Sequence, residues 1–478
     1  MKIASGPIVY ATAQFPVARA EMRLRLLSTY VFILGAVIAS ISASSASSTN
    51  EAFSSAAIVL GCTLVIAFGI ELQAGVRNIF RVDIFIVVVL YGLTFLEFLF
   101  DQEDLSYQLN AANACEAIDV TLCAFGGLMI GRHAFKMYAG DTLSDMTLSL
   151  SPSRMMGLLL GCTLIGYLHI LLAVNFDIVE ALRQMTLPRF SQSWTRNRMG
   201  GIEALLTELG LLIFLLPPLV GAILAEHRRY RWYQKAIAVL VLTLTLFFGF
   251  SGGTRYIFLT YLATFGASFL LLRRTISWSL LAAVGVPLAV VAGAAAHFMV
   301  HIRTVGVQNW EVGVERSDRF FVDMNILNIS GLIQSFPSRY DYLGFEVPFI
   351  AFVRPIPRVL WAGKPEGLSI SIEEVLGAEG WTLAATYIGE VWMASGLFAV
   401  VLASLIFGAA ASGWNRVGST AQGNLDKIVF ASGFFAAGLC MRSFMGVAPA
   451  VLPTVALLLF RNWQYRRQPR NPPRPRHL

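Results

Sequence analysis

Long apolar stretches recur along almost the whole of this 478-residue chain, and they limit what it can fold into. Hydrophobic residues make up 56% of the sequence and charged residues only 14%, too few charges to cover a water-soluble protein of this size. A helix needs about 20 consecutive apolar residues to cross a bilayer. By this measure we expect an all-α polytopic membrane protein with about twelve transmembrane helices, near residues 25–43, 55–71, 83–100, 113–131, 155–175, 203–225, 236–251, 255–272, 278–298, 386–410, 428–446 and 449–460.

The distribution of lysine and arginine predicts the orientation of these helices, because basic residues concentrate on the cytoplasmic side of a membrane. With the N-terminus inside, 23 of the 36 basic residues fall on that side, and the short outer loops 44–54 and 101–112 hold none. We therefore expect both termini to be cytoplasmic. The first apolar stretch resembles a signal peptide, but we expect it to be retained as the first span.

The apolar stretches and loops divide the chain into regions. We expect an N-terminal membrane bundle of about nine spans with an outer loop at 176–202, a large extracytoplasmic loop, C-terminal spans and a basic, disordered cytoplasmic tail, which cover residues 1–298, 299–385, 386–460 and 461–478. Within the large loop, residues 319–336 have helical apolar spacing, and residues 346–361 are apolar and interrupted by proline. This pattern predicts helices at the membrane interface instead of a domain with its own core.

Thirteen of the 36 basic residues lie outside in this topology, against the usual bias. Long loops cross a membrane regardless of charge, so one explanation is that these residues pair with nearby glutamate and aspartate. The other explanation is an anionic substrate, which we favour where the cations cluster.

The most compact cluster is Arg354-Pro-Ile-Pro-Arg358, followed by Trp361 and Lys364. Proline fixes the backbone angle φ, so the segment loses less freedom on folding. Arginine presents a planar fork of donors that matches phosphate oxygens. Trp361 and Tyr342 are suited to stacking on sugar rings or to lying among lipid headgroups. We therefore expect these five residues to form an anion site on the outer face.

Charged residues at the outer ends of spans are further candidates, because an arginine that faces lipid is unfavourable. Ser251-Gly-Gly-Thr-Arg255 joins two spans by a tight turn that leaves Arg255 at the membrane edge, and Arg303 follows another span. Either arginine can instead extend toward the headgroups from a helix end. Glu390 begins the span after the large loop, where its alternative role is a structural salt bridge.

His297 and His301 lie four residues apart at the end of a span, a spacing typical of metal ligands. However, Phe298 stands where a zinc protease has glutamate, and no cysteine or carboxylate cluster adjoins the pair. We therefore expect neither a metal nor another cofactor. His301 is a candidate proton acceptor near Arg303, with a purely structural role as the alternative.

The sequence around these candidates resembles the bacterial oligosaccharide repeat-unit polymerases (Wzy-type O-antigen and exopolysaccharide polymerases). Their large-loop signature is similar to the run Tyr342-Leu-Gly344…Ile356-Pro-Arg358-Val-Leu-Trp361-Ala-Gly-Lys364-Pro365, although Ala362-Gly363 stands where proline is common. Two further motifs of the family resemble Thr386-Tyr-Ile-Gly389-Glu390-Val-Trp392…Gly396 and Ser251-Gly-Gly-Thr-Arg255. The resemblance covers about residues 250–400 and is weak before residue 150.

The resemblance implies a membrane glycosyltransferase of the GT-C type at the periplasmic face of the bacterial inner membrane. Such an oligosaccharide repeat-unit polymerase moves a growing glycan from undecaprenyl pyrophosphate to the terminal sugar of a newly flipped lipid-linked repeat unit. Its partners would be this undecaprenyl-pyrophosphate-linked oligosaccharide, membrane lipids, a chain-length regulator and a flippase, and no nucleic acid.

Essential arginines in two outer loops are a family feature, so the resemblance also implies residue roles. Stabilisation of the leaving pyrophosphate would fall to Arg255, Arg303, Arg354 and Arg358. Arg189 and Arg198 would hold the second lipid-linked chain. Glu390 or His301 would accept the proton of the acceptor hydroxyl.

Two other functions remain open. An O-antigen ligase shares this architecture but transfers glycan to lipid A core, and the histidine expected in its large loop is missing, because residues 302–385 contain none. A flippase or other transporter of lipid-linked sugars would carry charges along many spans and show internal symmetry. In this chain the outward cations gather in loops, so we favour the polymerase.

Overall fold

The computed structural model of the chain describes residues 14–135, 148–196, 206, 208–273, 276–309, 320, 322–378 and 383–467. Within these ranges the secondary structure is helical, with no strand. Eight of the described helices are long and apolar enough to cross a membrane: α1 (Gln14–Ser44), α2 (Thr49–Leu72), α4 (Ala111–Gly131), α5 (Pro152–Ala173), α10 (Trp232–Ser251), α12 (Trp278–Val305), α16 (Thr386–Thr420) and α17 (Asn424–Arg442). The predicted class of helical membrane protein is therefore confirmed.

The remaining predicted spans are helical but shorter or interrupted. The described apolar helices of 10–17 residues include α3 (Val82–Thr94) and α11 (Arg255–Leu271), and a third joins η5 (Gly210–Leu215) to α9 (Leu216–Ala225). The stretch 83–100 breaks at Thr94 and continues as the 3-10 helix η2 (Leu96–Leu99). α18 (Val447–Arg466) contains Pro453. The count of about twelve spans consequently stays a prediction beyond the eight long helices.

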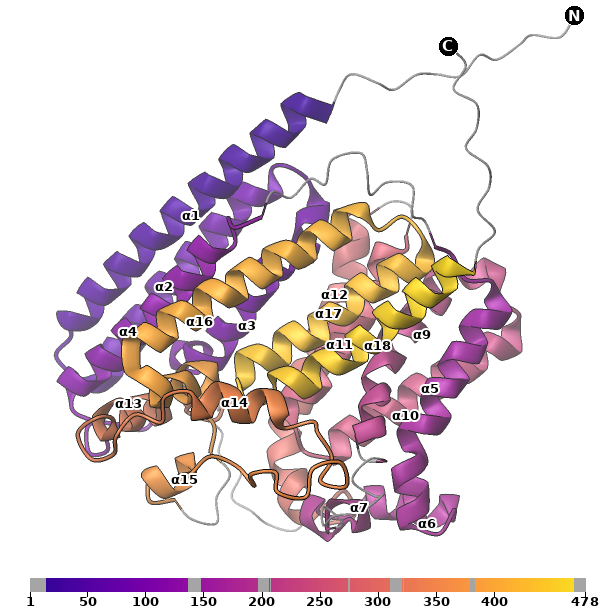
Figure 1. Cartoon of the computed structure of the whole chain (residues 1–478). Coiled ribbons are helices and arrows are strands. Elements are labelled where there is room, and N and C mark those ends of the chain that lie inside the picture. Colours follow the sequence, from indigo (N-terminus) through magenta and orange to yellow (C-terminus); the bar gives the residue numbers. More distant parts are fainter. Residues whose placement is uncertain are drawn as a thin grey trace, which may run out of the picture.

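The helices pack as two groups with α16, α17 and α18 between them (Figure 1). α1 to α4 form one group, and α5, α9, α10 and α11 belong to the other. Glycines allow α4 and α16 to come close: a β-carbon at Gly131 would lie 2.2 Å from the carbonyl oxygen of Leu405, and one at Gly408 would lie 2.3 Å from that of Leu128. Helices in lipid have no hydrophobic driving force to associate, so close van der Waals packing at small residues stabilises such crossings instead.

The short helices α6 (Ile178–Met185), α7 (Ser193–Arg196), α13 (Asn325–Ser335), α14 (Glu346–Val353) and α15 (Ile372–Val375) gather at one end of the bundle, the lower end in Figure 1. We call this the loop end. α13 packs on α3, α4 and α16, and α14 packs on α16 and α18. Buried residues of both helices, such as Ile329 and Val347, belong to the same hydrophobic core as α1 to α4. The described part of the large loop is thus built onto the bundle.

Several boundaries differ from those expected. Within the described part of the apolar stretch 319–336 the helix runs from Asn325 to Ser335, and α14 ends at Val353, before Pro355 and Pro357. The tail expected to be disordered from residue 461 continues α18 as far as Arg466, while residues 468–478 lie outside the described residues. The first six residues of the predicted tail, 461–466, are therefore helical and belong to α18.

α16 bends at Ser395 and Gly396, and this kink divides it into two parts. Residues 386–394 are all buried, whereas Leu397 and Phe398 beyond the kink are exposed. Gly396 has a φ of +59°, and a β-carbon there would lie 2.5 Å from the Tyr342 hydroxyl oxygen. Only glycine combines this conformation with this close approach. The backbone N–H groups of Leu343 and Gly344 donate to the carbonyls of Met393 and Ala394, at 2.8 and 2.9 Å.

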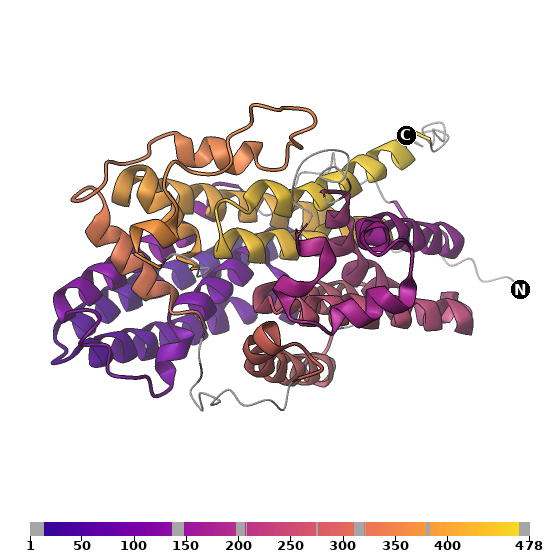
Figure 2. The same cartoon turned by 90° about the horizontal axis from the view of Figure 1, so that it is seen from below.

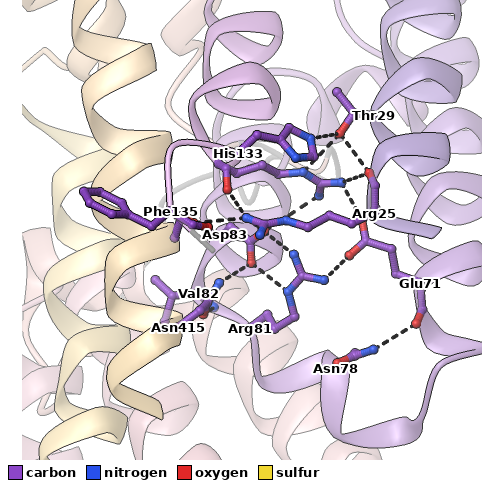
Figure 3. A network of polar contacts seen from close by, with 12 residues as sticks. Arg25, Thr29, Glu71, Asn78, Arg81, Val82, Asp83, His133, Phe135 and Asn415 are labelled. Carbon is purple, nitrogen blue, oxygen red and sulfur yellow. Dashed lines mark hydrogen bonds and ion pairs between the residues drawn. The ribbon is translucent and has the colours of Figure 1, made fainter. Parts of the chain in front are cut away.

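The opposite end of the bundle holds a buried network of charges (Figure 3). Arg81 binds both Glu71 and Asp83, and Arg132 donates to Glu71 at 2.6 Å. Arg25 lies 3.4 Å from Asp83 and also donates to the carbonyl oxygen of Arg132. All five side chains are at most 8% exposed. The network joins α1, α2, α3 and the end of α4.

Two further residues adjoin this network. Asn415 of α16 donates to Asp83 and accepts the backbone N–H of Val82. Glu21 lies close enough to Arg81 for its charge to act on it. Three arginines therefore lie near three carboxylates. This equal number of opposite charges matters because an unpaired charge buried in a low dielectric destabilises the protein.

Candidate functional site

The turn before α11 brings two of the predicted arginines together at the loop end. Gly253 has a φ of +62°, and a β-carbon there would lie 2.5 Å from the Cβ of Arg303. A glycine at this position therefore lets the end of α12 pack directly against the turn. Arg255 is the first residue of α11, two positions further on. The side chain of Arg303 consequently starts beside the turn that positions Arg255.

An aspartate of the large loop joins Arg255 to an arginine from a third helix. Asp323 accepts a hydrogen bond from Arg255 Nη2 at 2.8 Å and another from Arg442 Nη2 at 3.1 Å. Arg442 is the last residue of α17, and its guanidinium also lies 5.4 Å from the ring centroid of Tyr256. Both arginine side chains are mostly buried. Charge-assisted bonds of this kind are strong and fix the orientation of the donors.

Residues 322–325, which we call the clasp, place Asp323 between these arginines. Asp323 and Met324 have φ values of +84° and +47°, a conformation that costs energy for residues other than glycine and persists where surrounding contacts enforce it. Glu97 supplies such contacts, because its Oε2 accepts the N–H groups of Val322 at 2.7 Å and Met324 at 3.4 Å. Asn325 donates to the carbonyl of Leu93 at 2.8 Å and accepts from Arg442 Nη1 at 3.1 Å.

The carboxyl group of Glu97 is itself unusual. It is almost completely buried and lies close to the charges of Asp323 and Arg255. Within the described residues its Oε1 has no hydrogen-bond partner.

We call Arg255, Asp323, Arg442 and Glu97 the arginine cluster, and Glu390 connects it to the buried part of α16. Its Oε1 accepts the Ser443 hydroxyl at 2.7 Å, and its Oε2 accepts the N–H of Met445 at 2.8 Å. These residues directly follow Arg442 in the chain. Arg354 lies close enough for its charge to act on Glu390. Three predicted residues, Arg255, Glu390 and Arg354, thus lie around Arg442 and the segment that follows it, and Arg303 packs on the turn before Arg255.

Other predicted residues have local roles. Lys364 donates to the carbonyl oxygens of Arg354 and Ile356, so it closes its own loop. Partial burial lowers the pKa of Lys364, as do the charges of Arg358 and Arg354, while Glu208 opposes the shift. Arg358 is exposed and pairs with Glu366 at 3.0 Å. Among the described residues, these hydrogen bonds of Arg358 and Lys364 are all made within their own loop.

The two predicted aromatic residues pack on the protein. Tyr342 lies against Gly396 at the kink of α16, and its ring centroid is 6.4 Å from that of Phe336. Trp361 makes an edge contact with Phe349, with 6.3 Å between the ring centroids. Both rings therefore help to fix the course of the large loop.

The smaller outer loop docks against the end of α12, which carries His301 and Arg303. Val307 N–H donates to the carbonyl of Thr186 at 2.8 Å, and Gln308 Nε2 donates to Thr186 Oγ1 at 2.7 Å. Arg189 begins the 3-10 helix η4 (Arg189–Ser191) just after this contact. His301 is half-buried on α12. Arg198, the other arginine predicted in this loop, lies outside the described residues.

Arg442, Asp323 and Glu97 are members of the cluster that the sequence alone did not single out. Arg442 had one usable signal, because it interrupts an apolar stretch. No sequence signal marked Asp323 and Glu97 as partners, since Glu97 and the clasp are separated by more than 200 residues in the chain.

Comparisons with protein-family models, curated proteins and solved structures find no match to this chain.

Proposed function

We propose that this protein polymerises lipid-linked oligosaccharide repeat units into a surface polysaccharide at the outer face of a bacterial inner membrane. The observation that carries the proposal is the pairing of Arg255 and Arg442 on Asp323 at the loop end, with Arg303 on the adjoining turn and Glu390 and Arg354 nearby. Arginines at the ends of membrane helices are suited to a diphosphate whose lipid tail remains in the bilayer. The resemblance of residues 342–365 to the Wzy-type polymerases supports the same function.

In the proposed reaction the hydroxyl oxygen of the acceptor sugar attacks the anomeric carbon of the donor glycan. The bond from that carbon to undecaprenyl pyrophosphate breaks, and the pyrophosphate keeps the electron pair. Guanidinium groups stabilise the negative charge that develops on its oxygens. Arg442 is suited to this role because Asp323 and Asn325 engage its Nη groups, while its buried Nε has no partner among the described residues.

The proton of the acceptor hydroxyl must pass to a base. Both carboxylate oxygens of Glu390 already accept hydrogen bonds from the segment after Arg442. We therefore assign Glu390 a positioning role and His301, which lies two residues before Arg303 on α12, the role of proton acceptor. A positioned base typically contributes about 10²–10⁴ to the rate.

The test is the glycan pattern of a deletion strain complemented with variants. Arg255→Ala and Arg442→Ala should leave single repeat units in place of long polymer, while the protein still reaches the membrane. Arg183→Ala is the matched control, because Arg183 is an exposed arginine of the smaller outer loop that pairs with Glu180. Normal chain lengths from both cluster variants would refute the assignment.

The same strain separates the two alternative functions. Loss of the polymerase leaves single repeats on the surface, whereas loss of a flippase leaves none. Loss of an O-antigen ligase instead leaves finished polymer attached to undecaprenyl pyrophosphate. Either of the last two patterns in the deletion strain would replace the polymerase assignment.

A further inference from the structure

Large apolar side chains point away from the protein along α14 and the segment after it. Phe345, Phe352 and Leu360 are 78%, 66% and 75% exposed, and they belong to a set that we call the α14 ridge: Phe345, Phe349, Phe352, Ile356, Val359 and Leu360. On the opposite side of the helix Val347, Ile350 and Ala351 are buried against the bundle. The ridge is therefore an outward face of a helix that is already docked, and something apolar must cover it.

The position of α14 indicates what covers the ridge. Seen from the loop end, α14 lies at the rim of the molecule, outside α16 and α18, instead of over its centre (Figure 2). The chain just before α14 is hydrogen-bonded to the kink of α16 through Leu343 and Gly344. Directly beyond that kink Phe398 is 71% exposed and begins the outward apolar face of a membrane-spanning helix. The ridge thus starts where the lipid-facing surface of α16 starts.

Basic residues adjoin the apolar ones. Arg354 caps α14, and Arg358 follows two prolines that restrict the backbone. The Lys364 amino group, bound to the carbonyls of Arg354 and Ile356, closes this segment into a compact loop. Helices that lie at the boundary between acyl chains and headgroups typically carry phenylalanine and leucine next to arginine. Anionic headgroups attract such arginines.

We propose that the α14 ridge is a membrane-docking surface: its apolar side chains insert into the leaflet at the loop end, and Arg354 and Arg358 bind anionic phospholipid headgroups. Continuity with the lipid-facing side of α16 and the position at the rim favour bilayer lipid over a protein partner. The inference does not depend on the proposed catalytic function.

The test uses the full-length protein in nanodiscs made only of phosphatidylcholine and phosphatidylglycerol, with a membrane-impermeant maleimide. Phe352→Cys and Leu360→Cys place a thiol on the ridge, and Glu366→Cys is the matched control on the same loop, with a side chain that is 87% exposed. The native cysteines lie in or beside membrane helices, and the labelling of the unmodified chain is subtracted. We expect the control to be labelled and both ridge positions to be protected.

Three outcomes would overturn all or part of this membrane-docking proposal. Ridge thiols labelled as fast as the control would overturn the proposal, because water would then cover the ridge. Protection in native membranes but not in nanodiscs would overturn it in favour of a protein partner or a lipid-linked molecule. For the headgroups, a polarity-sensitive dye at Leu360→Cys should shift its emission when phosphatidylglycerol is included, and Arg354→Gln with Arg358→Gln should remove the shift. An emission independent of phosphatidylglycerol would overturn the anionic part.

Discussion

Replacing Asp83 with asparagine should destabilise the helix bundle by about 3–5 kcal/mol, because it removes one charge from a balanced buried set. Asp83 binds Arg81 through both carboxylate oxygens and lies 3.4 Å from Arg25 and 3.8 Å from Arg132. Without its charge, three buried arginines face only Glu71 and the less buried Glu21. A loss of about 4 kcal/mol lowers the folding equilibrium constant by roughly a thousandfold.

The assay is thermal unfolding of the purified full-length protein in nanodiscs, followed with a dye that fluoresces on reaction with thiols. Cys162 and Cys440 are buried and report loss of packing as they become accessible. Asp83→Asn should unfold at a clearly lower temperature than the parent. Asp101→Asn is the matched control, because Asp101 is exposed and surface substitutions usually change stability by less than about 0.5 kcal/mol.

A double variant tests the cause of the loss. Arg25→Gln combined with Asp83→Asn removes one cation with one anion, so it should cost less than the sum of the two single changes. An Asp83→Asn protein as stable as the parent would refute the reasoning. Strictly additive single changes would show that the two groups do not act on each other.

Three further predictions concern the loop end. Glu97→Ala should destabilise the protein by about 1–3 kcal/mol, because the N–H groups of Val322 and Met324 lose their acceptor. A thermal stability equal to that of the parent would contradict this role of Glu97. Gly396→Ala should destabilise the protein by about 1–3 kcal/mol, because Gly396 has a positive φ and contacts Tyr342. Gly126→Ala is the control, because a β-carbon there meets open space. Equal thermal stability of the two variants would show that the kink tolerates a side chain. For the proposed polymerase activity, Asp323→Ala should shorten the polymer, because it releases the two arginines that Asp323 holds. A normal glycan ladder would show that their alignment is dispensable.

The sequence located the basic residues of the predicted anion site but not their hydrogen-bond partners. The run from Arg354 to Lys364 was recognised by its charges and prolines, and Arg354 does lie near Glu390. However, Lys364 uses its amino group on two carbonyls of the same loop, and Arg358 pairs with Glu366. These are local hydrogen bonds whose geometry depends on how the loop closes, and a list of residue types does not contain that geometry.

The apolar stretches by themselves determined that this chain forms membrane helices. In lipid every backbone N–H and C=O must be paired within the segment, so a long apolar run has essentially one solution. The scarcity of charge in such runs also marked Arg255 and Glu390, because a charged residue there needs a specific partner. Neither argument requires knowledge of which helices are neighbours.

Only the tertiary structure decided which residues are the partners of these charged side chains. Asp323 reaches Arg255 and Arg442 because Glu97 of η2, which is distant in the chain, holds the left-handed turn at the clasp. The charge network of Arg25, Glu71, Arg81, Asp83 and Arg132 likewise joins four helices that are separate in sequence. Electrostatic pairing depends on distance in space, and for residues so far apart in the chain that distance is set by the packing of the whole bundle.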